Sequence, residues 1–254
     1  MHPDRSFPRE QRYEEDELAY AMREVWSRMY HAGRAVLIDP LFDELAGKFV
    51  QARIAGQYFS VPTWRFVAGA PHAFRANHES VVKSLTSQRV GDKSVLYTTR
   101  VREDQLSPSS PWMIQDLVEA DRDVTVVCIR GALFAFEFER GTMPERVLDW
   151  RQARARNPQQ EWRPHRLPPA LAEAIMKFMD AMALHYGRLD FLLAGETYWF
   201  LEVNPNGEWG WLDPDGRNGI LDALVEELSP DTPCHSLPNP RRITVSKIRV
   251  DEGK

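Results

Sequence analysis

Residues 188–204 have the pattern of a β-hairpin, and no other part of the chain says as much about the fold. Segments 188–193 and 197–204 mix apolar and polar residues as half-buried strands do, and the short run Ala194-Gly195-Glu196 separates them. Glycine in such a run is typical of a turn. We therefore expect two antiparallel strands folded symmetrically about Glu196.

The register of this hairpin brings polar side chains together. Symmetry about the turn places Asp190 opposite Glu202 and Arg188 opposite Asn204. Residues that face each other across an antiparallel pair share one side of the sheet, as do residues two apart in one strand. Asp190, Glu202 and Asn204 are thus expected to converge. The residues that alternate with them are expected to point into the core: Leu201 and Val203.

Two carboxylates placed opposite each other repel, so a cation must compensate them. Arg188 is one candidate, in a surface ion pair of little energetic weight. The other candidate is a divalent metal, because two carboxylates and an amide are hard oxygen ligands that suit Mg²⁺ bound together with phosphates. Spacing alone leaves both readings open. The following segment 205–211, Pro-Asn-Gly-Glu-Trp-Gly-Trp, favours the metal, since a purely structural strand end has little use for such a loop.

Composition limits the classes of protein to consider. The 254 residues are 43% hydrophobic and contain 8 Trp, 7 Tyr and 12 Phe, which predicts a globular chain of one large domain or two small ones. No apolar stretch approaches the ~18 residues of a membrane helix. The net charge of -5 argues against general nucleic-acid binding. Two cysteines, Cys128 and Cys234, form no disulfide framework and fit a reducing cytoplasm.

The remaining periodicity predicts an α+β fold. Helices are expected over 13–32, from Leu41 to the break at Val61-Pro62, and from Pro169 to about His185. Shorter extended segments are expected at 64–67, 80–83, 95–101, 113–118, 123–129 and 133–140.

The hairpin and its loop resemble the ATP-grasp superfamily, and within it the peptide ligases that macrocyclise ribosomally made precursor peptides, the microviridin or graspetide type. The resemblance is carried by Gly-Arg-Leu-Asp-Phe at 187–191, Leu-Glu-Val-Asn-Pro-Asn-Gly at 201–207 and Trp-Gly-Trp at 209–211. Weaker matches lie upstream, at Gly47-Lys48, Val81-Val82-Lys83, the segment 114–118 and Asp149-Trp150-Arg151. The similarity spans roughly residues 38–228.

The resemblance implies an ATP-grasp fold, in which two α+β subdomains clamp the nucleotide between them. On this basis residues 1–40 are a remnant of an N-terminal region with one helix, 41–113 form the N-terminal subdomain, 114–235 form the C-terminal subdomain and 236–254 form a basic tail. Related ligases usually carry a small domain before the helix that begins here at Tyr13.

The resemblance also implies cofactors and site residues. ATP and Mg²⁺ are the expected cofactors, with Mg²⁺ held by Asp190, Glu202 and Asn204. Lys48 and Lys83 would contact phosphates. The adenine hinge would be Gln115, Asp116, Leu117 and Val118. For the ribose-binding acid Glu119, Asp121 and Asp123 compete, and Asp123 is counted among the nucleotide-binding candidates.

The implied reaction is an ATP-dependent ligation through an acyl phosphate. The expected substrate is an acidic precursor peptide that receives ω-ester or ω-amide crosslinks, and the catalytic candidates are Arg151 and Arg188. Trp209 and Trp211 either wall the substrate pocket or pack in the core, and arginines up to Arg166 either dock the peptide or form a flexible loop. Alternatives are a RimK-like or glutathione-synthase-like ligase that joins two molecules, and an inactive nucleotide- or peptide-binding relic. A homodimer is a further expectation.

Overall fold

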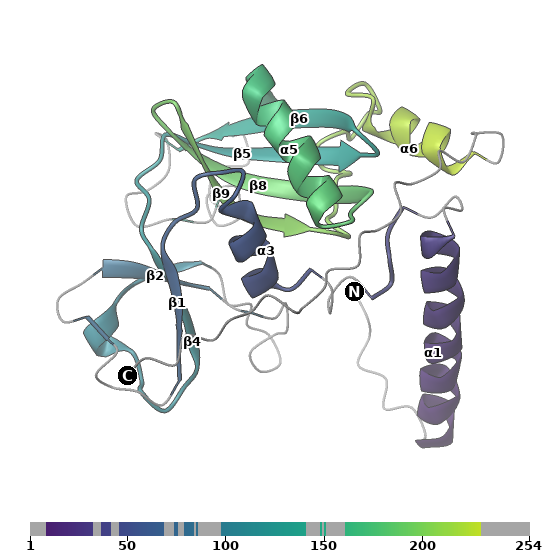
Figure 1. The fold of residues 1–254 in the computed structure, drawn as a ribbon, viewed down its shortest axis with the longest axis horizontal. Coiled ribbons are helices and arrows are strands. Elements are labelled where there is room, and N and C mark those ends of the chain that lie inside the picture. Colours follow the sequence, from purple (N-terminus) through teal and green to yellow (C-terminus); the bar gives the residue numbers. More distant parts are fainter. Residues whose placement is uncertain are drawn as a thin grey trace.

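The computed structural model consists of two antiparallel sheets flanked by helices (Figure 1). It describes residues 9–32, 37–41, 46–68, 74–75, 79–83, 85, 98–140, 148, 150 and 161–229. The larger sheet has the strand order β7-β6-β5-β8-β9, and the smaller sheet has the order β1-β4-β2-β3. The bounds of the larger sheet's strands are β5 Arg122–Ile129, β6 Ala132–Glu139, β7 Arg163–Pro164, β8 Tyr186–Ala194 and β9 Thr197–Asn204.

One face of the larger sheet is buried under helix α5 (Pro169–Ala181), which lies across the strands (Figure 1). Proline begins this helix because its missing N–H is not needed in the first turn. The predicted apolar stripe of α5 packs on alternate residues of β5 and β8 in one cluster of buried side chains, which includes Ile175, Phe178, Val126 and Leu189. This contact fixes α5 to the centre of the sheet.

The opposite face of the larger sheet carries the polar residues of the hairpin. One end of this face is covered by helix α6 (Ile220–Leu228) and by the segment between β9 and α6. Asp213 caps α6, because its carboxylate accepts hydrogen bonds from the N–H groups of Ile220 and Leu221. Asp190, which lies on this face, is half-buried.

The smaller sheet lies beside the larger one, and helix α3 (Lys48–Ala55) lies between them in Figure 1. The strands of the smaller sheet are β1 Trp64–Val67, β2 Glu79–Lys83, β3 Thr99–Arg102 and β4 Trp112–Asp116. The 3₁₀ helix η2 Glu103–Gln105 follows β3. β4 pairs with both β1 and β2, so the smaller sheet extends through Asp116. Residues 117–121 then connect it to β5.

Helix α1 (Arg9–His31) confirms the helix expected over 13–32 and stands beside the sheets (Figure 1). Near its C-terminal end, α1 contacts the rest of the structure. There the Tyr30 hydroxyl donates a hydrogen bond to the carbonyl oxygen of Ala183 at 2.6 Å. His31 also lies 3.0 Å from Asp39. None of the helices within the described residues is long and apolar enough to cross a membrane.

The α+β prediction is confirmed, and β1 and β9 have the expected bounds. The helix expected from Leu41 is wrong at its start, because residues 40–41 form a turn, and α3 begins at Lys48 after Gly47. Three of the described elements were not expected: η2, β7 and α6. Part of the strand expected at 95–101 and the whole tail 236–254 lie outside the described residues.

Candidate functional site

The β8–β9 hairpin places Asp190 opposite Glu202 and Arg188 opposite Asn204, as the sequence predicts. The symmetry about Glu196 is nevertheless wrong. Ala194 pairs with Thr197 across a two-residue turn whose Gly195 has a φ of 58°, a conformation that glycine adopts without strain.

A β-bulge restores the expected register further from the turn. Phe191 pairs with Phe200 while Asp190 pairs with Glu202, so Leu201 is the extra residue in β9. Leu201 is therefore only half-buried and not in the core as expected, whereas Val203 is fully buried in the cluster under α5. The bulge keeps Glu202 and Asn204 on the face that carries Asp190.

Asp190 is held by side chains from three neighbouring strand positions. The Thr125 hydroxyl of β5 donates to one carboxylate oxygen at 2.8 Å. Arg188 lies 3.3 Å and the Asn204 amide nitrogen 3.5 Å from the other oxygen. The carboxylate is thus oriented before any ligand arrives.

The ion pair between Arg188 and Asp190 considered from the sequence is present, but Arg188 is buried and the pair does not lie at the surface. Only 6% of the residue is exposed, and its guanidinium donates to the carbonyl oxygen of Glu208 at 3.0 Å and lies over the Trp211 ring. Burial alone would lower the pKa of Arg188, but Asp190 and Glu202 raise it above its ordinary value. Arg188 is therefore a fixed positive charge beside Asp190.

Glu202 is neutralised from a different element. The Lys48 ammonium, at the start of α3, lies 3.1 Å from one oxygen of Glu202, and the Asn204 amide donates to the other at 3.4 Å. Burial would raise the pKa of Glu202, but the charges of Lys48 and Lys83 and these hydrogen bonds lower it to about 2. Glu202 is ionised at neutral pH.

Gln51 fixes helix α3 to the edge of the hairpin. Its buried amide nitrogen donates to the Ala46 carbonyl at 2.5 Å, and its amide oxygen accepts a hydrogen bond from the Val203 N–H at 2.9 Å. Because Lys48 lies one turn before Gln51, this contact holds Lys48 beside Glu202. Neither Gln51 nor Thr125 is a site residue predicted from the sequence. The sequence points to them only through their positions near predicted site residues. Gln51 lies three residues after Lys48, and Thr125 lies two residues after Asp123.

The expected hinge residues lie where the chain passes from one sheet to the other. Gln115 is buried in β4 opposite Trp64 and Val81, and Leu117 and Val118 follow the strand as half-buried connecting residues. The Asp116 carboxylate lies 2.6 Å from the Arg75 guanidinium. Asp116 and Gln115 alternate along β4, so their side chains lie on opposite faces of the smaller sheet.

The three acids considered for ribose differ in what engages them. Asp123 is nearly buried and forms an ion pair with Arg140 at 2.7 Å. Asp121 accepts a hydrogen bond from the N–H of Gly195 at the hairpin turn, and Glu119 is exposed and paired with Arg100. Asp123 shares a face of the sheet with Thr125, and hence with Asp190, so Asp123 stays the candidate.

Trp211, which follows the hairpin, packs against two tryptophans that precede it in the chain. Trp211 lies 4.7 Å from Trp150 and 5.2 Å from Trp162 between ring centroids, which supports the packing interpretation for Trp211. Trp209 is half-buried against the same end of the sheet. Arg166 is exposed. The catalytic candidate Arg151 lies outside the described residues, so its role stays a prediction.

The donor set fits a magnesium ion bound together with phosphates. Within the described ranges no group of three His, Cys, Asp or Glu side chains is placed to hold a metal ion, so protein carboxylates and histidines alone do not complete a coordination shell. Asp190, Glu202 and Asn204 offer two carboxylates and an amide oxygen on one face. Mg²⁺ commonly takes one or two carboxylates and fills its other positions with water and phosphate oxygens.

Of the comparisons with known proteins, the one with solved structures gives matches. No family model matches the sequence, and no curated protein matches it. An ATP-grasp ligase from Chryseobacterium gregarium, solved with ADP and a leader and core peptide, is 21% identical with a TM-score of 0.71 over 84% of this chain and 68% of that one. The macrocyclase MdnC from Microcystis aeruginosa, solved with its precursor peptide, is 22% identical with a TM-score of 0.71 over 89% and 74%.

A more distant match widens the comparison beyond peptide-modifying enzymes. D-alanine–D-alanine ligase from Bacillus anthracis is 14% identical with a TM-score of 0.52 over 80% of this chain and 74% of that one. Identities this low establish the architecture. The chain has the ATP-grasp fold, and its structure resembles those of the ATP-grasp ligases that modify ribosomal peptides.

Proposed function

We propose that this protein is an ATP- and Mg²⁺-dependent ligase that activates a peptide carboxylate as an acyl phosphate. The observation that carries the proposal is the convergence of Asp190, Glu202 and Asn204 with Lys48 on one face of a hairpin in an ATP-grasp fold. Several similar structures were solved with ADP or an ATP analogue, and two of these also contain Mg.

In this proposal the chain's own residues bind and orient the nucleotide. Lys48 and Lys83 contact phosphate oxygens as point charges, and residues 115–118 contact the adenine. Asp190, Glu202 and Asn204 hold Mg²⁺, which when bound neutralises charge on the transferring phosphoryl group. Asp123 is the candidate for the ribose. The contacts of Arg188 favour a positioning role for this catalytic candidate, because its guanidinium donates to Asp190. Arg151 is proposed as the clamp on the transferred phosphate.

The proposed reaction has two steps. A substrate carboxylate attacks the γ-phosphorus of ATP, which forms an acyl phosphate and releases ADP. A hydroxyl or amine of the substrate then attacks the acyl carbon, loses its proton, and displaces phosphate. Attack by a hydroxyl gives an ω-ester, and attack by an amine gives an ω-amide. Neither step needs a nucleophile from the protein, so rate enhancement comes from proximity and from electrostatic stabilisation.

The proposed substrate is an acidic, ribosomally made precursor peptide. MdnC was solved with a precursor peptide, and the Chryseobacterium ligase with a leader and core peptide. A peptide with several Asp or Glu side chains supplies carboxylates to activate. The exposed Arg163, in β7, and Arg166, two residues after it, are cations that attract such a peptide.

The test is incubation of the protein with ATP, Mg²⁺ and acidic peptides that contain Ser, Thr or Lys. We expect phosphate release and a peptide lighter by one water per bond, with hydroxylamine cleaving esters and leaving amides. Glu202→Gln should abolish both signals, whereas Glu196→Gln, an exposed glutamate at the tip of the same hairpin, should not. Activity that persists in Glu202→Gln contradicts the assignment.

A second candidate function keeps the same first step but joins two molecules. The likeness to D-alanine–D-alanine ligase, which extends over most of this chain, favours considering it. It predicts a product heavier than the acceptor, so mass spectrometry of the same reactions separates it from cyclisation. A nucleotide-binding relic would bind Mg-ATP and release no phosphate with any peptide.

We also propose that the protein acts in the cytoplasm as a homodimer. The thiol of Cys128 is buried and free, which a reducing compartment preserves. The dimer proposal rests on the exposed apolar face of α1, where Leu18, Met22 and Val25 are each about half-exposed or more.

A further inference from the structure

We infer that Lys48 is an internal counter-cation of the metal site. Lys48 stays paired with Glu202 until a divalent cation arrives with nucleotide and displaces Lys48 from this carboxylate. The protein would then bind free divalent cation weakly and take up cation and nucleotide together. This inference rests on the proposed function, because it concerns the same three ligands. It adds an order to the binding events, and it assigns Lys48 opposite effects on the two ligands.

The contacts of Glu202 show that its oxygens are already in use. Lys48 lies 3.1 Å from one oxygen and the Asn204 amide 3.4 Å from the other. A cation coordinated by Glu202 must replace at least the Lys48 contact, because an ammonium and a metal ion cannot share one carboxylate oxygen without strong repulsion. Metal binding at this site is therefore an exchange and not an addition.

The charges around the site determine which ligands it attracts. Two carboxylates, Asp190 and Glu202, are surrounded by three cations, Lys48, Lys83 and Arg188, which leaves a net charge of +1 among these side chains. Such a site repels a free divalent cation and attracts a nucleotide triphosphate, which carries a charge of about -2 even with magnesium bound. Nucleotide phosphates also offer the displaced Lys48 a new partner.

The two nearest cations differ in their freedom to move. Arg188 is buried, is held by the Glu208 carbonyl, and lies over Trp211, so it stays with Asp190. The Lys48 side chain is 29% exposed and ends in a compact charge on a flexible four-carbon stem. Gln51 fixes only the backbone from which Lys48 extends. Lys48 is thus the cation that can leave while the frame of the site stays in place.

The test measures cation and nucleotide binding separately, in protein stripped of metal by a chelator. Free Mn²⁺ is followed by its electron paramagnetic resonance signal, first without nucleotide. We expect Lys48→Gln to bind Mn²⁺ about tenfold more tightly than the wild type, because Glu202 loses its competing ammonium. The same variant should bind Mn-ATP more weakly. Lys48→Arg keeps the charge and should bind free Mn²⁺ as weakly as the wild type.

Two further variants serve as controls. Arg53→Gln removes an exposed cation from the same helix and should change neither affinity. The double variant Lys48→Gln/Glu202→Gln should lose the gained Mn²⁺ affinity. Urea unfolding of Lys48→Gln checks that the variant is folded, and Lys48→Met serves in its place if it is not.

The outcomes separate this inference from the proposed function. If Lys48→Gln binds free Mn²⁺ no more tightly than the wild type while Glu202→Gln still weakens Mn-ATP binding, the counter-cation role is overturned and the metal site stands. If Glu202→Gln leaves Mn-ATP affinity unchanged, the metal site itself is overturned. A tighter Mn²⁺ complex that the Glu202 substitution removes supports both.

Discussion

Glu103 is the most completely buried charge among the described residues, with an exposed fraction of 0%. Its carboxylate accepts hydrogen bonds from the Arg65 and Arg75 guanidinium groups, from the Ser80 hydroxyl at 2.5 Å and from the Arg75 N–H at 2.8 Å. Removing one partner of a buried pair leaves the others uncompensated. We expect Glu103→Gln to lower the free energy of unfolding by about 3–5 kcal/mol, measured by urea denaturation. Asp104→Asn, next in the chain and partly exposed, should cost far less, and equal losses would contradict this role.

The same carboxylate makes stability depend on pH. Burial would raise the pKa of Glu103, but Arg65, Ser80 and Arg75 lower it from the ordinary 4.5 to about 2. A carboxyl whose pKa is lowered by folding stabilises the protein fully above its unfolded pKa, and this contribution is lost as the pH falls toward the folded pKa. Between pH 4.5 and 2 the wild type should therefore lose stability more steeply than Glu103→Gln. Parallel slopes in urea unfolding across this range would refute the assignment.

At the scale of single residues, the sequence predicted the site residues whose positions are decided by one hairpin alone. Asp190, Glu202 and Asn204 converge because strand alternation and one turn decide their positions, although the turn and the bulge differ from the symmetric hairpin assumed. Thr125 and Gln51 come from other elements. No local pattern states which strand lies beside β8 or which helix packs on β9, so these two partners could not be foreseen.

At the scale of elements, the junction of α3 with β9 determines where Lys48 lies. Gln51→Met keeps the side-chain volume but leaves the buried Val203 N–H without its acceptor. Such an unsatisfied group costs about 1–3 kcal/mol, so urea unfolding should show a loss of that size. Mg-ATP affinity, measured by calorimetry, should also fall, because α3 no longer holds Lys48 beside Glu202. Arg53→Met on the exposed side of the same helix is the matched control. Unchanged nucleotide affinity in Gln51→Met would show that the junction does not position Lys48.

The loop after β9 approaches Arg188 so closely that glycine is required. A Cβ atom at Gly207 would lie 2.8 Å from the Arg188 Cβ and 3.1 Å from the Asn204 Cβ. Gly207→Ala must therefore displace side chains that shape the site, and overpacking of this kind costs about 1–3 kcal/mol. We expect lower stability and weaker Mg-ATP binding, by thermal unfolding and calorimetry. Gly210→Ala, where a Cβ meets no atom within 4 Å, should be nearly neutral. Equal behaviour of the two variants would argue against close packing at Gly207.

Elements with a clean periodicity were predicted best. β9 and β1 have the expected bounds, and the stripe of α5 packs as expected. The start of α3 was missed because apolar spacing continues back to Leu41 while the chain turns there. Helix α6 was not predicted, because no secondary structure was assigned after the loop 205–211.

At the scale of the whole molecule, the arrangement of the two sheets follows from pairings between distant segments. β4 lies between β1 and β2, an order that no local pattern states. The ATP-grasp architecture was therefore reached through the resemblance of the 187–211 segment, and the structural comparisons confirm it. Periodicity alone gave an α+β fold and no more.

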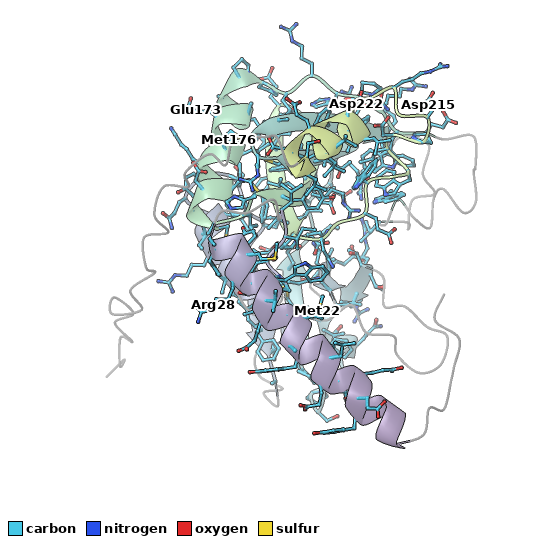
Figure 2. All side chains as sticks on the ribbon, turned by 90° about the vertical axis from the view of Figure 1, so that its right-hand side faces the viewer. Met22, Arg28, Glu173, Met176, Asp215 and Asp222 are labelled. Carbon is cyan, nitrogen blue, oxygen red and sulfur yellow. The ribbon has the colours of Figure 1, made fainter. Side chains whose placement is uncertain are left out.

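Several apolar side chains of helix α1 are exposed, Met22 among them (Figure 2). Leu18, Met22, Val25 and Met29 are between 39% and 64% exposed, and their spacing of four, three and four is that of a coiled-coil seam. In sequence, the first half of α1 (9–20) holds five acids and two arginines, and the second half (21–31) holds two arginines and one acid. A second copy packed antiparallel would therefore place acidic turns against basic ones, whereas a parallel copy would align like charges.

The dimer proposed above should form through this antiparallel contact. Sedimentation equilibrium at micromolar concentrations should give twice the chain mass, with dissociation favoured at high salt because the flanking charges are screened. Met22→Glu puts a charge in the seam and should give a monomer that still binds Mg-ATP, since α1 contributes no residue to the nucleotide site proposed here. Tyr20→Glu adds the same charge on the opposite side of the helix and should leave the dimer intact. A wild-type protein that is monomeric throughout this range, or a Tyr20→Glu variant that dissociates as readily as Met22→Glu, would rule out self-association through this face.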